Sequence, residues 1–186
     1  MKKIIVNDIA IVNSGVFIRP EKVKEGNISY LQARHFDDYG ELREKLELIL
    51  WDVNERHILK KWDILFSSKW TRMYTAMYKE EFWKCVASSS FYVIRLQEKK
   101  YLPEYISIYI NSVVNTKNFQ ANYVTGNSIK MVKKWALLWI KIPDISIEKQ
   151  KKVVDINNEI IKQKWILVKL IEKKSQFLEN VILNSK

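Results

Sequence analysis

Apolar residues at helical spacing dominate the C-terminal end of the chain. The segment from Ile147 to Leu183 contains no proline or glycine, and its apolar residues recur every three or four positions. Ser146 is a favourable N-cap residue, and Glu148 puts a negative charge near the positive end of the helix dipole. This pattern predicts a single helix about 55 Å long, at a rise of about 1.5 Å per residue.

The apolar residues of this segment form two neighbouring rows. The first row consists of Val153, Ile156, Ile160, Leu167, Leu170, Phe177 and Val181, and the second consists of Val154, Ile161, Trp165, Val168, Ile171, Leu178 and Ile182. Two rows are more than a strict two-stranded coiled coil requires, so one could pack on the protein's own domain or another protein while the other faces a partner helix. A helix that covers its own domain is the alternative, but a small domain cannot cover this whole length. The residues predicted to face a partner are Val153, Ile156, Ile160, Trp165, Leu167, Leu170, Phe177 and Val181.

The residues before this helix combine short β-type runs with one clear amphipathic helix. Pro103 suits the first turn of a helix, and apolar side chains recur at helical spacing from there to Val114. A second, short helix is expected over 129–135, whereas 41–50 fits either a short helix or a solvated connection. Runs of β-branched and aromatic residues predict strands over 4–12, 28–31, 62–66, 82–90, 91–96 and 136–142.

A proline-containing break separates the two kinds of pattern. Pro143 and Asp144 end the last predicted strand just before Ser146 opens the long helix. We therefore expect two parts, a mixed domain of helices and strands over 1–145 and a long helix over 146–186. The mixture of separate strands and helices in the first part is typical of the α+β class.

The chain is strongly basic, with a formal net charge of +11 over 186 residues. A surplus of that size favours binding to a polyanion, because neutralised phosphates release their condensed counterions. A generally solvated lysine surface would produce the same net charge, so charge alone leaves both readings open. The 47% apolar and 12% aromatic residues are enough to build a real core, which argues against disorder.

Cysteine usage and hydropathy favour a cytoplasmic protein. Cys85 is the only cysteine and lies in an apolar run, so we expect a buried thiol and no internal disulfide. Lys2 and Lys3 are followed by only a short apolar run, which does not fit a signal peptide. No stretch is apolar over the roughly 18 residues that a membrane span requires, so we expect no membrane contact.

The residue constellations that catalysis requires are missing from the sequence. His35 and His57 have no cysteine or carboxylate at metal-ligand spacing, and the four glycines form no phosphate-binding loop. Asp63, together with the charged residues of 80–84, faintly resembles a nuclease cluster, but a role for Asp63 in a turn before a strand is favoured. We expect a non-catalytic protein with no metal and no cofactor.

Three segments resemble the target-recognition domain of the specificity subunits of type I restriction-modification systems. The first is 59–67, where an Asp-Ile-Leu triplet precedes a serine and Trp62 stands where the family usually has glycine. The second is 85–106, with a small-residue strand, an arginine and then Leu-Pro-Glu-Tyr. The third is 126–150, where Ile-Pro and Glu-Lys-Gln lead into the long helix, with Ile145 in place of the usual second proline. Together they span nearly the whole chain.

This resemblance implies an α+β fold in which a target-recognition domain with a curved β-sheet is followed by a long C-terminal helix. In the family, each domain reads one half of a split site on double-stranded DNA, and paired antiparallel helices set the gap between the halves. Methyltransferase subunits, and in some complexes restriction subunits, supply the chemistry. A full-length subunit resembles two such units, so the single unit here implies a half-subunit. We expect it to form a homodimer through its helix, and pairing with a different half-subunit is the alternative. A basic non-catalytic adaptor and an inactive remnant of a longer subunit are the alternatives.

The same resemblance implies that basic and polar residues in the loops contact DNA. Lysine and arginine would hold phosphates, while arginine, asparagine and glutamine can read base edges through paired hydrogen bonds. For each of these residues, a solvated surface position is the alternative. The candidates are Arg19, Lys22, Arg34, His35, Lys69, Arg72, Tyr74, Lys117, Asn118 and Gln120.

Overall fold

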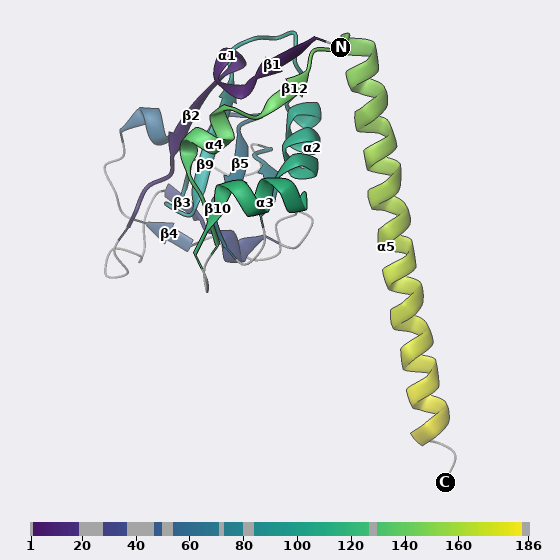
Figure 1. Ribbon diagram of the computed structural model, residues 1–186. Helices are drawn as coiled ribbons and strands as arrows, with labels where there is room; N and C mark the ends of the chain where they lie inside the picture. The colour runs from purple at the N-terminus through teal and green to yellow at the C-terminus, as the bar shows by residue number, and fades with distance from the viewer. Residues whose placement is uncertain are drawn as a thin grey trace.

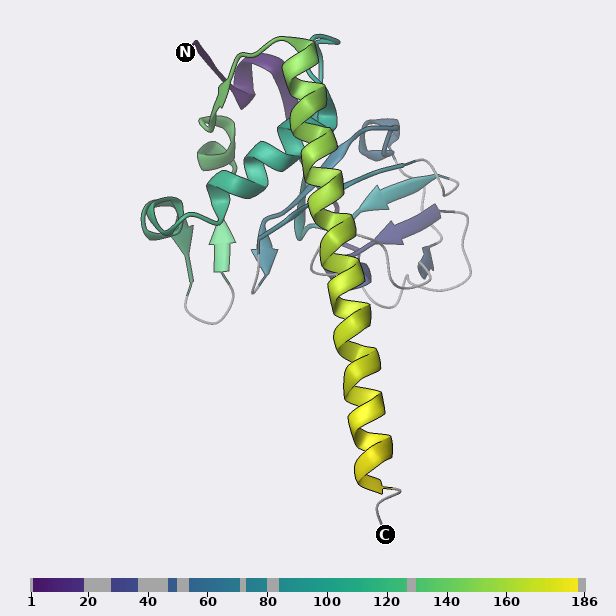
Figure 2. The same ribbon diagram turned by 90° about the vertical axis from the view of Figure 1, so that its right-hand side faces the viewer.

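The computed structural model describes residues 2–18, 28–36, 47–49, 54–70, 73–79, 84–126 and 130–183. These residues build a head of short strands and helices, and helix α5 (Ile147–Leu183) leaves the head as a single long rod (Figure 1, Figure 2). The predicted α+β class is confirmed, and α5 begins and ends at the predicted residues.

A four-stranded antiparallel sheet forms the centre of the head. Its strands follow the spatial order β2 (Ala10–Ser14), β9 (Phe91–Leu96), β5 (Ile64–Ser67) and β7 (Thr75–Met77). Successive side chains of a strand point to opposite faces, and this sheet is covered on both. Ile64 and Phe66 belong to one apolar core, whereas Leu65 belongs to a second core on the other face.

Helix α2 (Pro103–Val114) covers one of these two faces. Its side chains Ile106 and Ile110 are fully buried in the core that contains Ile64 and Phe66. Pro103 occupies the first turn, where a missing amide donor costs nothing. The predicted bounds of this helix are confirmed, because the helical period and the proline were both present in the sequence.

Three smaller sheets surround the central one. In the first, β1 (Lys3–Ile5) pairs with β12 (Lys141–Pro143) just before α5. The second has the order β10 (Val124–Thr125), β11 (Lys130–Val132) and β6 (Lys69–Trp70). The third has the order β4 (Glu47–Ile49), β3 (Ile28–Leu31) and β8 (Cys85–Ala87). The other helical segments are α1 (Val6–Ile9), α3 (Lys117–Tyr123), α4 (Lys134–Leu138), η2 (Ala33–His35) and η3 (Glu55–His57).

Several predicted elements differ from the structure where a short apolar run fits helix and strand alike. The predicted strand over 4–12 is interrupted by α1, so that β1 and β2 join different sheets. The predicted helix over 129–135 is wrong at 130–132, which form strand β11. This strand is stabilised by hydrogen-bonded pairing with β6 and β10 on its two sides. The predicted strand over 136–142 is wrong at its start, because α4 continues to Leu138.

The buried thiol of Cys85 is confirmed, and its environment predicts that it is chemically inert. Burial raises the pKa of this thiol to about 12, so below that pH it carries its proton and lacks the reactive thiolate. An unfolded cysteine has a pKa of about 8.5. We therefore expect a thiol reagent at pH 8 to modify the folded protein about a thousand-fold more slowly than the protein in denaturant. Absorbance of the released reagent group measures both rates, and modification of the folded protein within minutes would contradict the prediction.

Candidate nucleic-acid interface and projecting helix

Helix α5 touches the head only near its N-terminal end. Among the described residues of α5, Gln150 alone is buried, and Val153 and Val154 are half-buried against the first core. All residues over 162–183 are exposed. In both ribbon views the helix starts at the β1–β12 end of the head and continues past the opposite end (Figure 1, Figure 2). The alternative in which the helix covers its own domain is therefore wrong for this distal part.

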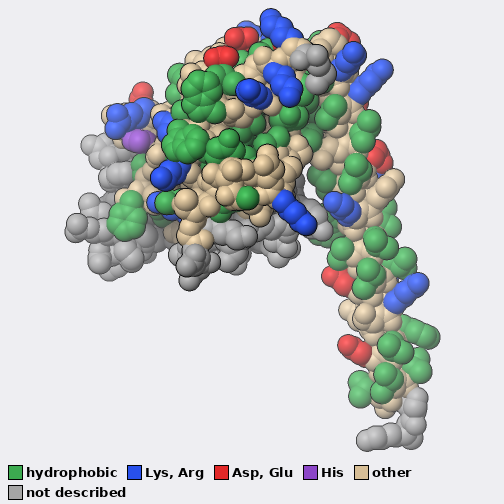
Figure 3. All heavy atoms as spheres, in the orientation of Figure 1, with side chains coloured by type: hydrophobic (Ala, Val, Ile, Leu, Met, Phe, Trp, Pro, Cys, Tyr) green, Lys and Arg blue, Asp and Glu red, His purple; other side chains and the backbone are tan. Residues whose placement is uncertain are grey.

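Both apolar rows are exposed along the distal part of α5. In the first row Leu167 is 56% exposed, Leu170 47% and Phe177 71%, and the second row is exposed from Trp165 onward. Green apolar side chains gather along the rod in the space-filling view (Figure 3). On the surface of a folded protein, a continuous apolar patch of this kind typically marks a site that contacts another protein or a membrane. The structure thus leaves the predicted partner-facing residues available for such a contact, apart from the half-buried Val153.

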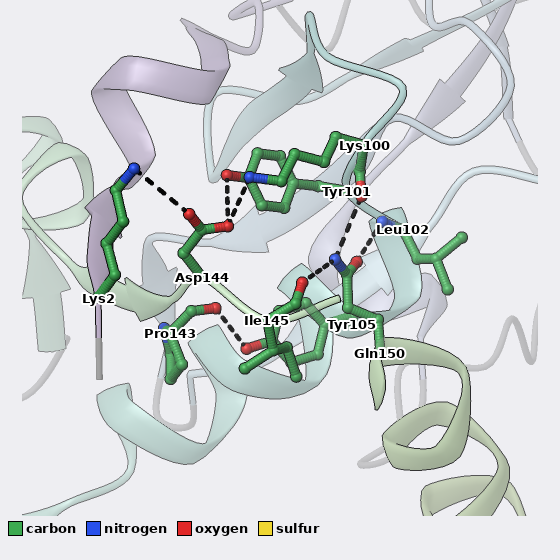
Figure 4. Close-up of polar contacts among 9 residues, drawn as sticks. All are labelled: Lys2, Lys100, Tyr101, Leu102, Tyr105, Pro143, Asp144, Ile145 and Gln150. Atoms are coloured by element: carbon green, nitrogen blue, oxygen red, sulfur yellow. Dashed lines mark hydrogen bonds and ion pairs between the residues drawn. The ribbon is translucent and has the colours of Figure 1, made fainter. Parts of the chain in front are cut away.

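A network of hydrogen bonds joins α5 to the start of α2, and Figure 4 shows its members. The side-chain Oε1 of Gln150 accepts a hydrogen bond from the backbone N–H of Leu102 at 2.8 Å. Its Nε2 donates to the carbonyl oxygens of Lys100, at 3.2 Å, and Ile145, at 3.0 Å. The amide of this one side chain therefore satisfies three backbone groups, on both sides of the contact. We call this set of bonds the joint.

Charged side chains surround the joint on its solvent side. The Asp144 carboxylate accepts from Lys100 Nζ at 2.7 Å and from the Tyr101 hydroxyl at 3.1 Å, and Lys2 Nζ lies 3.8 Å away (Figure 4). The hydrogen bond from Lys100 lowers the pKa of Asp144. The Tyr105 hydroxyl donates to the carbonyl of Pro143 at 2.9 Å, which secures the segment just before α5. Solvent screens the ion pairs, so the buried amide of Gln150 is the more specific contact.

The structure separates the predicted DNA-contacting residues into several groups. Arg19, Lys22 and Arg72 lie outside the described residues. Arg34 is exposed in η2, and Lys69 is exposed in β6. Three further candidates lie on helix α3 and not in the loop that the sequence had suggested; they are Lys117, Asn118 and Gln120, all exposed or half-buried. The Thr116 side chain caps this helix by accepting from the N–H of Phe119, a signal that was readable in the sequence.

Lys69 and the candidate residues on helix α3 are neighbours in the fold. Helix α3 runs directly into β10, whose Thr125 pairs with Met131 of β11, and Met131 pairs in turn with Lys69 of β6. Lys69 and α3 are therefore connected through one small sheet. Arg34 follows β3 in a different sheet. Strands β10, β3 and β4 all lie at the end of the head that is farthest from the start of α5 (Figure 1).

His35 and Tyr74 do not have the surface position that base reading requires. His35 is only 1% exposed, and its Nδ1 accepts from the backbone N–H of Gln32 at 3.2 Å. The Tyr74 hydroxyl donates to the carbonyl of Ala33 at 2.9 Å, and its ring packs against Phe91. Both side chains hold the second core and η2 together, so we do not retain them as candidate DNA contacts.

Asp63 has a structural role. Its carboxylate is buried and accepts two hydrogen bonds from the Arg95 guanidinium, at 2.6 and 2.8 Å, and one from the backbone N–H of Lys60 at 2.8 Å. Arg95 also donates to the carbonyl of Ile58 at 3.0 Å. The hydrogen bond to Asp63 raises the pKa of Arg95. The carboxylate is therefore committed to closing the turn before β5, as the sequence favoured, and Arg95 is the partner that sequence reasoning missed.

The turn that Asp63 closes also carries exposed groups that the sequence did not single out. Trp62 is 44% exposed and has a φ of 71°, a left-handed backbone conformation that glycine adopts far more readily. This explains the usual glycine at this position in the family that the segment resembles. Lys60 and Lys61 precede Trp62 and are exposed with it, as is Arg56 in η3. The departure from glycine was the one signal in the sequence that could have drawn attention to this turn.

Metal ligation and membrane insertion find no support in the described ranges. They contain no group of three or more histidine, cysteine or acidic side chains that could hold a metal ion. None of their helices could span a bilayer; α5 has the length but carries charged residues along it.

Comparisons with known proteins identify the fold through solved structures and not through sequence. No protein-family model matches the chain, and no curated protein matches it in sequence. The S subunit of a type I restriction-modification system from M. genitalium matches with a TM-score of 0.58 and 14% identity, over 94% of this chain and 42% of that one. The HsdS subunit from Thermoanaerobacter tengcongensis matches with a TM-score of 0.66 and 12% identity, over 91% and 39%.

A third match comes from a structure that describes complex assembly and conformational transition of the type I R-M system. Its TM-score is 0.70 at 13% identity, over 97% of this chain and 43% of that one. The chain therefore spans about two fifths of the length of each of these three chains. In its described residues, the protein has the fold of an HsdS-like specificity subunit of type I restriction-modification systems, in the form of one head followed by one long helix.

Proposed function

We propose that this protein is the DNA-recognition component of a type I restriction-modification system and acts as half of a specificity subunit. Residues 1–145 form the target-recognition domain, and residues 146–186 form the spacer that pairs with a second copy. Each head reads one half of a split site on double-stranded DNA. A methyltransferase subunit, and in the full system a restriction subunit, docks on the paired framework and supplies the catalysis.

The observation that carries this proposal is the exposed, two-row apolar surface of a rod fixed to a head with the HsdS-like fold. An isolated helix of this kind needs a partner, because both rows are in water over 162–183. A symmetric pair presents two identical heads in opposite orientation, which suits a palindromic split site. The net charge of +11 favours the polyanionic ligand.

Sequencing of DNA methylated by the reconstituted complex tests the proposed function. The chain is combined with the methyltransferase subunit of the same system, and we expect modification at a palindromic, split target. A non-catalytic adaptor would bind the partner without sequence preference. An inactive remnant would remain a monomer and recruit no methyltransferase. Either of these two results would overturn the proposal.

Charge reversal at Lys69 or Lys117 is expected to weaken binding of the complex to all DNA sequences alike. We expect each of these exposed lysines to hold a phosphate, and loss of one phosphate contact makes the negative slope of log affinity against log salt less steep by about one. Gel-shift titrations at several salt concentrations measure this slope for Lys69→Glu and Lys117→Glu. Lys99→Glu makes the same charge change at an exposed position next to the joint and should leave the slope unchanged. If all three variants had the same slope, neither Lys69 nor Lys117 would contact a phosphate of the DNA.

A further inference from the structure

The direction of α5 relative to the head is set by contacts at one end of the helix, mainly with α2 and the chain just before it. The buried amide of Gln150 fixes one point through its three hydrogen bonds, two of them to the chain just before α2. Val153 and Val154 pack on the first core one turn later and fix a second. Two fixed points define an axis, whereas the ion pairs of Asp144 lie on the solvent side and add little rigidity.

The geometry of a lever amplifies any change at these two points. Gln150 and Val154 are four residues apart, about 6 Å along the helix, while about 50 Å of helix extends from Gln150 to Leu183. A movement of about 1 Å at Val154 would therefore turn the helix by about 10° and shift its far end by about 8 Å. Successive nucleotides of a DNA strand are about 3.4 Å apart along the duplex, so this shift equals about two base pairs.

We propose that Gln150 is a positioning residue that sets the angle between the head and α5, and thereby the gap length accepted between the two half-sites. The second part of this inference rests on the proposed function; the first part does not. Gln150 suits this role because its planar amide uses both its acceptor and its donors on backbone groups. Backbone groups hold their positions more firmly than side chains, so the three bonds tolerate little rotation.

A distance measurement within one chain tests the angle without DNA or any partner. Spin labels are attached at Glu55→Cys on the head and Asn180→Cys near the end of α5, both exposed, while the buried Cys85 stays unlabelled. Labelled chain is diluted with unlabelled chain, so that only distances within one chain contribute. We expect a narrow distribution for the parent protein. Gln150→Leu, which removes all three hydrogen bonds, should broaden or shift it by several ångströms.

The controls separate a positioning role from a general loss of structure. Gln176→Leu makes the same chemical change at an exposed position of α5 outside both apolar rows and should keep the narrow distribution. Val154→Ala weakens the packing of α5 on the first core and keeps the hydrogen bonds of Gln150. If Gln150→Leu fails to fold, the distance distribution is measured in Val154→Ala instead, and we expect it to broaden. A broad distribution in the parent protein would overturn the proposal. If Gln150→Leu folds and keeps the narrow distance distribution of the parent, the proposal is overturned. If Gln150→Leu does not fold, a narrow distribution in Val154→Ala overturns it instead.

Methylation sequencing then tests the consequence for gap length. With Gln150→Leu in the reconstituted complex, we expect the same half-sites to be modified at gaps one or two base pairs longer or shorter than the parent's. A broadened distance distribution with an unchanged gap would overturn the link to spacing while leaving the joint intact. Absence of methylation by the parent complex would instead count against the proposed function, and the distance measurement would still stand.

Discussion

Leu170→Glu is expected to convert the proposed dimer into monomers and to weaken pairing about a thousand-fold. Leu170 lies in the middle of the first apolar row and is 47% exposed in the single chain, so a partner helix would bury it. Loss of that burial removes about 2 kcal/mol per side chain, and a twofold pair contains the residue twice. About 4 kcal/mol corresponds to three orders of magnitude in the dissociation constant. Light scattering over a range of concentrations measures the mass.

The matched control for this variant lies on the polar side of the same helix. Asn180→Glu adds the same charge outside both apolar rows, at an exposed position, and should pair like the parent protein. The split target should also be lost when Leu170→Glu joins the methyltransferase, because one head alone reads one half-site. If Leu170→Glu had the mass of the parent at every concentration, the first row would not be the pairing surface.

Arg95→Leu is expected to lower the free energy of unfolding by about 3 kcal/mol. The Asp63 side chain is 1% exposed, so removal of its guanidinium partner leaves a buried carboxylate with only the N–H of Lys60. An uncompensated buried charge typically costs about 3–5 kcal/mol, and the lower figure applies here because the Arg95 site is open to water at one side. Chemical denaturation followed by circular dichroism measures the change.

Two further variants identify the cause of this loss. Arg56→Leu removes the same charge from an exposed position beside the same turn and should change stability by less than about 0.5 kcal/mol. Asp63→Asn in the Arg95→Leu background removes the stranded charge and should recover part of the stability. If Arg95→Leu were as stable as Arg56→Leu, the buried pair would not hold the turn before β5.

The elements that the sequence predicted well have a local cause. Helix α2 was predicted from its proline and its apolar period, and α5 from 37 residues without a helix breaker. The burial of Cys85 followed from the apolar residues around it. In each case the residues that produce the feature are neighbours in the chain, so their pattern can be read without knowledge of the fold.

The elements that were predicted wrongly depend on distant partners. Residues 130–132 form a strand because β6, sixty residues earlier in the chain, is in place to pair with them. His35 and Tyr74 look like polar surface residues in the sequence, but contacts between segments about 40 residues apart bury them. Short polar–apolar runs carry no information about such partners, and tertiary context overrides local preference there.

The sequence by itself determined that this protein has a basic head and a long helix with two apolar rows, because charge and helical period are properties of the chain alone. Only the tertiary structure decided which surfaces face water and how the head meets the helix. The pairing of Asp63 with Arg95 and two of the three bonds of Gln150 join residues more than thirty positions apart. Such contacts depend on the packing of the whole head, which positions distant backbone groups to within hydrogen-bond distance of one side chain.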